Sequence, residues 1–179
     1  MTALAAGENV ALTLVTSKLT VGFGWRIIAS NSPDPELVPA AVLCNAQGDA
    51  LDTASLVFHN QLATPEDSLR YVTDGDEEQI DVDISLIPAE VHKVLFLLFV
   101  DPELRRPGTF ASASNVYLRL ADRAGNDVAR FDLGPTPPST NVVLLAELYR
   151  YASAWKFRAL GETYDSGIAG VATSLNLGL

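Results

Sequence analysis

Cysteine and histidine are scarce in this chain. Among 179 residues there are one cysteine, Cys44, and two histidines, His59 and His92. A single cysteine excludes a disulfide framework within the chain and favours a reducing compartment. One cysteine and two distant histidines are also too few for a tetrahedral zinc site. Because no Lys, Arg or His adjoins Cys44 in the sequence to lower its pKa, we interpret it as a small buried hydrophobic residue.

Several motifs of nucleotide-binding proteins and hydrolases are missing as well. The sequence has no glycine-rich loop followed by Lys-Ser or Lys-Thr, and no Gly-x-Gly-x-x-Gly. It also lacks the Gly-x-Ser-x-Gly turn that presents a nucleophilic serine. His59 lies in a predicted strand and His92 in a predicted helical turn, far apart along the chain. We therefore expect that the protein is not an enzyme.

Positive charge and long apolar runs are scarce too. Lys and Arg number 12 against 22 Asp and Glu, which gives a net charge of −10. Such a chain repels phosphate backbones, so we expect no nucleic-acid partner and favour cations instead. The longest apolar run, residues 94–100, is too short to cross a bilayer, and the first residues lack the pattern of a signal peptide. We expect no direct membrane insertion and a cytoplasmic protein.

Strand signals dominate what is present. In residues 19–25, apolar side chains alternate with Thr20, Gly22 and Gly24. Short segments of this kind recur between breaks rich in Gly, Pro, Asn and Asp, and predict strands at 10–15, 19–25, 38–44, 55–60, 68–72, 78–84, 93–100, 115–121, 127–133, 141–151 and 154–163. Their spacing is typical of an all-β antiparallel sandwich of two packed sheets, here a single domain over residues 1–179. The strand at 93–100 is apolar on both faces, so we place it centrally.

Two segments have helical signals. Residues 88–93 predict one turn, with Pro88 at its first position. Residues 165–179 predict a short C-terminal amphipathic helix whose apolar face holds Ile168, Val171, Ala172 and Leu175. We predict that this face packs on three residues of the preceding strand: Trp155, Phe157 and Leu160. Trp25 follows Val21 and Phe23 at period two, so it should point into the sandwich near its rim.

The stretch TDGDEEQIDVDI, residues 73–84, joins an acidic turn to an alternating strand. Its carboxylates are Asp74, Asp76, Glu77 and Glu78, grouped around Gly75. Calcium takes roughly six to eight oxygen ligands from carboxylates, carbonyl groups and water in a flexible loop. The stretch is therefore either a solvated acidic turn or half of a cation site. In a cation site, Asp76 and Glu78 would form the core, and other acidic loops, such as the one with Asp34 and Glu36, would converge on it.

An ordered set of segments also matches one family pattern from end to end. The segments are GENVALT (7–13), Gly24-Trp25, LVFHNQLATPEDSLRY (56–71), GDEEQI (75–80), FASASNVYLRLAD (110–122) and, most specific of all, ELYRYASAWKFRALGETYDSGIAGV (147–171). Together they resemble the TerD family of tellurium-resistance and stress proteins. The resemblance implies a sandwich of two antiparallel sheets and a role in stress response or resistance.

The resemblance further implies calcium at loops with three signatures: Asp-Leu-Asp, Gly-Asp-Asn-x-Thr-Gly and Gly-Asp-Asp-Glu. This chain has Glu36-Leu37-Val38 at the first and lacks the second. It keeps the third at residues 75–78, with Glu77 in place of the second Asp. Because charge and ligand number set calcium affinity, the losses predict a weak site. Its candidate ligands are Glu36, Asp74, Asp76, Glu77 and Glu78.

A second hypothesis needs no metal. A sandwich that has lost its calcium ligands can still use loops or an edge strand to bind another protein. The partner would be an unidentified protein, with other TerD-like proteins among the candidates. Titrating calcium into chelated protein separates this calcium-independent interaction module from the calcium-binding one.

Overall fold

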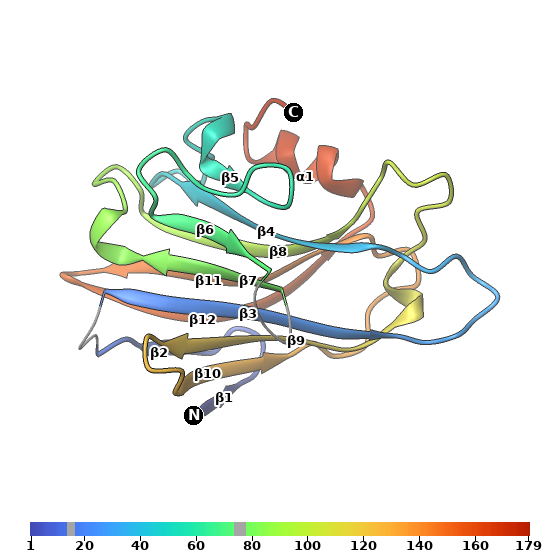
Figure 1. The fold of residues 1–179 in the computed structure, drawn as a ribbon, viewed down its shortest axis with the longest axis horizontal. Helices are drawn as coiled ribbons and strands as arrows, with labels where there is room; N and C mark the ends of the chain where they lie inside the picture. Colours follow the sequence, from blue (N-terminus) through green and yellow to red (C-terminus); the bar gives the residue numbers. More distant parts are fainter. Residues whose placement is uncertain (14–16, 74–77) are drawn as a thin grey trace.

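Two sheets pack face to face (Figure 1). The computed structural model describes residues 1–13, 17–73 and 78–179. Among these, sheet A has six strands in the spatial order β1 (Thr2–Leu4), β10 (Asp127–Asp132), β9 (Ala113–Asp122), β3 (Lys18–Ile27), β7 (Glu78–Asp83) and β6 (Leu69–Val72). Sheet B has six in the order β2 (Asn9–Ala11), β12 (Ala154–Tyr164), β11 (Val142–Tyr151), β8 (Lys93–Val100), β4 (Leu37–Cys44) and β5 (Leu56–Val57). The short helix α1 (Gly167–Ser174) follows β12.

The predicted all-β sandwich with a short C-terminal helix is confirmed. Neighbouring strands pair antiparallel, with β1 against β10 as a parallel exception at the edge of sheet A. The sequence analysis missed β1 because a strand of three residues is too short to show alternation. No helix among the described residues has the length and apolar character needed to cross a membrane.

The main core lies between the sheets. Inward residues of β3 and β7, such as Val21, Phe23 and Ile80, are fully buried against the inner face of sheet B. β8 lies between β11 and β4, so its predicted central position is confirmed. Its outer residues Leu95 and Leu97 are also buried, because α1 covers that part of the outer face of sheet B. Burial on both sides explains why this strand is apolar throughout.

The predicted packing of Trp155 and Phe157 on the terminal helix is wrong. Both side chains point into the core between the sheets, whereas α1 lies on the opposite, outer face of sheet B. Leu160 does contact the cluster under the helix, which also contains Val171 and Ala172. The reason is the period of two along a strand, which puts residues 155 and 157 on one face and residue 160 on the other.

The predicted helical turn at 88–93 is a single hydrogen-bonded turn. The Val91 N–H donates to the Pro88 carbonyl over 3.0 Å, and no helix follows. A 3₁₀ helix lies just before it, at Ile84–Leu86, where the Asp83 carboxylate accepts a hydrogen bond from the Ser85 N–H. Two further 3₁₀ helices span Thr53–Ser55 and Phe110–Ser112.

Gly24 and Trp25 face opposite sides of sheet A. Trp25 is half-buried and packs on the main core, which confirms its predicted orientation. Gly24 faces outward, where the ring of Tyr117 lies so close that a Cβ atom would collide with it. The glycine therefore gives the Tyr117 ring room to lie flat on the sheet.

Candidate functional site

Glu78 lies at the start of β7 and faces the inside of the sandwich. It shares one side of the strand with Ile80 and Val82, which are both buried. Tyr71 on the neighbouring β6 faces the same side, and its phenol donates a hydrogen bond of 2.6 Å to Glu78 Oε2. The hydrogen bond fixes one oxygen of the carboxylate at the rim of the core. The other oxygen, Oε1, accepts no hydrogen bond from the described residues.

The position of the Tyr71 hydroxyl strongly changes its pKa. Burial raises the pKa of Tyr71 well above its usual range, and the hydrogen bond to the Glu78 carboxylate raises it further. Both causes oppose a second negative charge beside Glu78. Tyr71 therefore stays a neutral hydrogen-bond donor, and it positions the Glu78 carboxylate without competing for a cation.

The raised pKa of Tyr71 predicts a loss of stability at alkaline pH. Below about pH 10, Tyr71 is neutral in both the folded and the unfolded chain. Above it, the unfolded tyrosine ionises while the folded one does not, so the free energy of unfolding falls, by up to about 1.4 kcal/mol per pH unit. Urea unfolding from pH 9 to 11 should show a shallower fall in Tyr71→Phe than in the wild type. Equal slopes would contradict the prediction.

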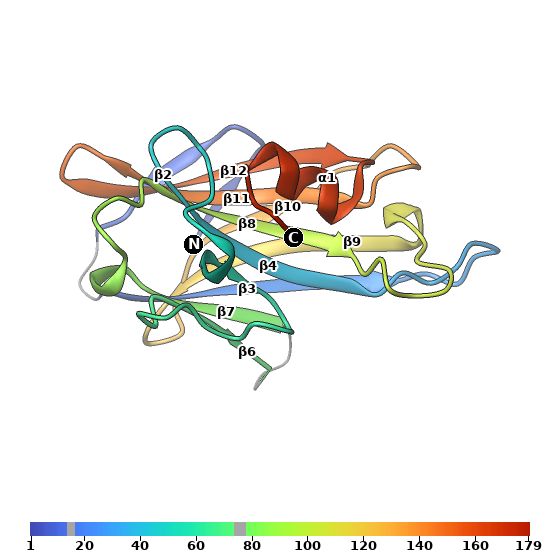
Figure 2. The same ribbon diagram turned by 90° about the horizontal axis from the view of Figure 1, so that it is seen from above.

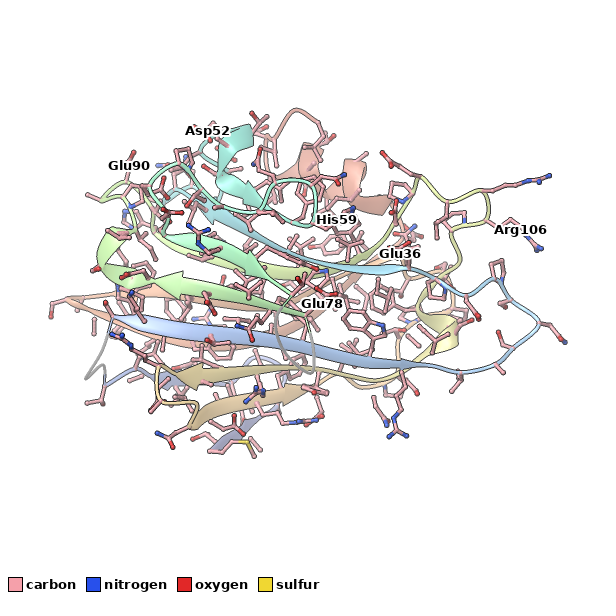
Figure 3. The ribbon with its side chains drawn as sticks, viewed as in Figure 1. Glu36, Asp52, His59, Glu78, Glu90 and Arg106 are labelled. Atoms are coloured by element: carbon pink, nitrogen blue, oxygen red, sulfur yellow. The ribbon has the colours of Figure 1, made fainter. Side chains whose placement is uncertain are left out.

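Glu36 adjoins sheet B, whereas Glu78 belongs to sheet A (Figure 3). Glu36 is exposed and directly precedes β4, and its carbonyl accepts a hydrogen bond of 2.8 Å from the Asp101 N–H. In β4, Leu37 faces the main core and Val38 the outer face. The alternation continues back to Glu36 and places it on the outer side of sheet B. Glu36 therefore faces away from the space between the sheets, whereas Glu78 faces into it.

The other predicted ligands, Asp74, Asp76 and Glu77, lie outside the described residues. Within residues 1–13, 17–73 and 78–179, no three His, Cys, Asp or Glu side chains gather closely enough to hold a metal ion. The described part of the site thus supplies one positioned carboxylate, that of Glu78. A carboxylate oxygen is a suitable ligand for calcium, but a site needs several more oxygens.

The scarce reactive residues lie apart from Glu78. Cys44 is fully buried, and burial raises its pKa to about 12, so it remains a protonated thiol. This confirms the interpretation of Cys44 as a small buried hydrophobic residue. His59 and His92 are both exposed, and the His59 ring packs edge-on against Phe58 at 5.4 Å between ring centroids.

A cluster of cations and tyrosines on the outer face of sheet B was not predicted from the sequence. We call it the outer-face patch, and its members are Lys93, Tyr149, Tyr151, Lys156 and Arg158, around the buried Glu147. The pattern that could have revealed the patch is the alternation of side chains between the two faces along both strands of the β11–β12 hairpin. Pairing the strands about the turn at residues 152–153 places Tyr149 opposite Lys156, and Glu147 opposite Arg158.

Comparison with known proteins identifies relatives over nearly the whole chain. The model of the TerD domain family matches residues 1–175. Tellurium resistance protein TerD of Alcaligenes sp is 31% identical over 94% of this chain and 93% of its own length. General stress protein 16U of Bacillus subtilis (strain 168) is 30% identical over 97% of this chain and 96% of its own length.

Solved structures share the fold. A crystal structure of a homologue of telluride resistance protein (TerD) from Streptomyces coelicolor A3(2) superposes with a TM-score of 0.66. The match covers 88% of this chain and 95% of that one, at 16% identity. At this identity the likeness concerns the fold alone.

Proposed function

The chain belongs to the TerD domain family, and on that basis we propose that it is a non-enzymatic stress-response and tellurium-resistance module of the cytoplasm that binds calcium weakly. The observation that carries the calcium proposal is the Glu78 carboxylate, which Tyr71 positions at the inner rim of the sandwich. Glu78 ends the Gly-Asp-Glu-Glu stretch that resembles the family's calcium signature. Its Oε1, which accepts no hydrogen bond from the described residues, is available to a cation.

Low affinity follows from the ligands that this chain lacks. Glu36 faces the outer side of sheet B, away from Glu78. Residue 38, where the signature has a carboxylate, is a buried valine. The ion would therefore depend on residues 74–78 and on water. Fewer charged ligands weaken a calcium site, and we expect a Kd on the order of 10⁻⁴ M or weaker.

Calcium is expected to raise the melting temperature. A ligand that binds the folded state alone stabilises it by about 1.4 kcal/mol at tenfold excess over Kd and about 2.7 kcal/mol at a hundredfold excess. For a chain of this size this corresponds to a rise of several degrees, at roughly 2–4 °C per kcal/mol. The measurement compares melting in millimolar calcium and in chelator.

Three substitutions test the assignment. Asp76→Asn and Glu78→Gln should each abolish the calcium response, since each removes a charged ligand. Glu90→Gln makes the same chemical change on an exposed turn and should leave the response intact (Figure 3). If calcium leaves the wild-type melting temperature unchanged, and the first two substitutions are neutral or stabilising, the calcium proposal is wrong.

The outer-face patch favours a second candidate function, a calcium-independent protein-interaction module. The patch consists wholly of described residues and needs no metal to form. Tyrosine and arginine are among the residue types enriched at protein interfaces. In this function the sandwich acts as a rigid support that presents a binding surface to another protein.

A further inference from the structure

The outer face of sheet B is divided into a covered and an uncovered part. Under α1, apolar residues such as Leu97, Phe99 and Val142 pack against Val171 and Ala172. Figure 2 shows that the tip of the β11–β12 hairpin extends well beyond α1. The outer-face patch occupies this hairpin and the adjoining start of β8, so these strands present charged and aromatic side chains where the helix ends.

The buried Glu147 carboxylate pairs with two cations of the patch, Lys93 and Arg158. The residue is 7% exposed. Its Oε1 accepts a hydrogen bond of 3.1 Å from Arg158 Nη1, and its Oε2 lies 3.8 Å from Lys93 Nζ. A buried carboxylate is stable only with such partners. Glu147 therefore holds both cations in place, while each cation keeps about a third of its side-chain surface open to solvent.

The two tyrosines hold cations over their rings. The guanidinium carbon of Arg158 lies 4.5 Å from the centroid of the Tyr149 ring. Lys156 Nζ lies 3.9 Å from the centroid of the Tyr151 ring, and Lys156 forms no ion pair with the described residues. Tyr151 is 59% exposed. Lys156 and Arg158 are thus positioned by aromatic rings, and both remain available to an outside anion.

The charge of the patch is opposite to that of the whole protein. Within the patch as defined, Lys93, Lys156 and Arg158 carry three positive charges and Glu147 carries one negative charge. The patch therefore has two net positive charges, on a chain whose net charge is −10. We propose that the outer-face patch binds a short acidic segment of a partner protein. This inference names the partner chemistry of the calcium-independent function above, rests on that function, and does not depend on calcium.

A short acidic segment fits better than a long polyanion. The net charge of −10 repels nucleic acid or an anionic membrane, whose charges extend past the patch to the rest of the protein. A peptide with about two carboxylates at the patch is matched locally, because screening reduces the repulsion beyond about 8–10 Å. The Tyr149 and Tyr151 rings add apolar contact area to the side chains and backbone of such a peptide at little entropic cost.

A binding assay with a defined probe tests the proposal. A fluorescein-labelled oligoglutamate peptide is titrated with the full chain in chelator, and anisotropy is followed at low and at physiological salt. We expect saturable binding that weakens as salt rises. Lys156→Glu should weaken binding by about fivefold or more, and Lys156→Gln by less, because the first also introduces repulsion.

Arg106→Glu is the matched control. It makes the same kind of charge reversal on an exposed loop at the opposite end of the molecule (Figure 3) and should change affinity by less than about twofold. Tyr151→Ser should also weaken binding. Equal effects of Lys156→Glu and Arg106→Glu, no binding by the wild type at low salt, or tighter binding of an oligothymidylate than of the peptide would each overturn the proposal. Because the peptide assay is run in chelator, a negative result in it does not bear on the calcium response, which the melting experiment tests separately.

Discussion

Trp155→Ala is expected to lower the free energy of unfolding by about 3–5 kcal/mol. The indole is 7% exposed and belongs to the core between the sheets. The guanidinium carbon of Arg150 lies 4.5 Å from its ring centroid, and Arg150 in turn donates hydrogen bonds to the carbonyl groups of Val91 and Pro88. Truncation would leave a cavity and remove the cation–π contact that holds Arg150 of β11, the residue that links this strand to the turn before β8.

Urea unfolding followed by circular dichroism measures this loss, since tryptophan fluorescence changes with the substitution itself. Tyr151→Ala is the control. It also removes an aromatic ring from this hairpin, but Tyr151 is 59% exposed. We expect it to change stability by less than about 1 kcal/mol. If Trp155→Ala loses no more than Tyr151→Ala, the indole does not contribute to the core as its burial indicates.

The position of Trp155 shows how much of this fold the alternation of apolar residues along a strand can predict. Period-two alternation was sufficient to place Val21, Phe23 and Trp25 on one face, and the apolar character of both faces was sufficient to identify β8 as a central strand. Alternation gives the faces of a strand but not which face a later helix covers. The face that the helix covers depends on the twist and packing of both sheets. The sequence pattern alone therefore led to α1 being predicted on the wrong side of β12.

The candidate site was predictable to a similar extent. The alternation of β7 correctly placed Glu78 on the side of Ile80 and Val82. The Tyr71 hydrogen bond was beyond prediction, because it depends on the register between β6 and β7, in which Tyr71 pairs with Ile80. The outer-face patch required the hairpin register in the same way, although its residues lie close together in the sequence.

Gly161→Val is expected to destabilise the protein by about 2–5 kcal/mol, the sum of a backbone and a packing cost. Gly161 lies in β12 where the register with β11 shifts, and its φ is +72°, a conformation that a β-branched residue strongly disfavours. A Cβ atom there would lie 2.9 Å from Cζ of Phe131. Phe131 is 3% exposed in the core and has little room to move. Urea denaturation measures the loss.

Gly125→Val separates the two costs. Gly125 has a φ of +85° in an exposed turn, and nothing lies within 4 Å of its added Cβ. That substitution should therefore show the backbone cost alone, about 1–2 kcal/mol. The excess in Gly161→Val measures the collision with Phe131, and it should shrink when Phe131→Ala is combined with it, because the two residues are in direct contact. Equal losses for the two valine substitutions would mean that the inner face of β12 has space at this position. The close approach of β12 to Phe131 of β10 in sheet A would then not limit the residue at 161.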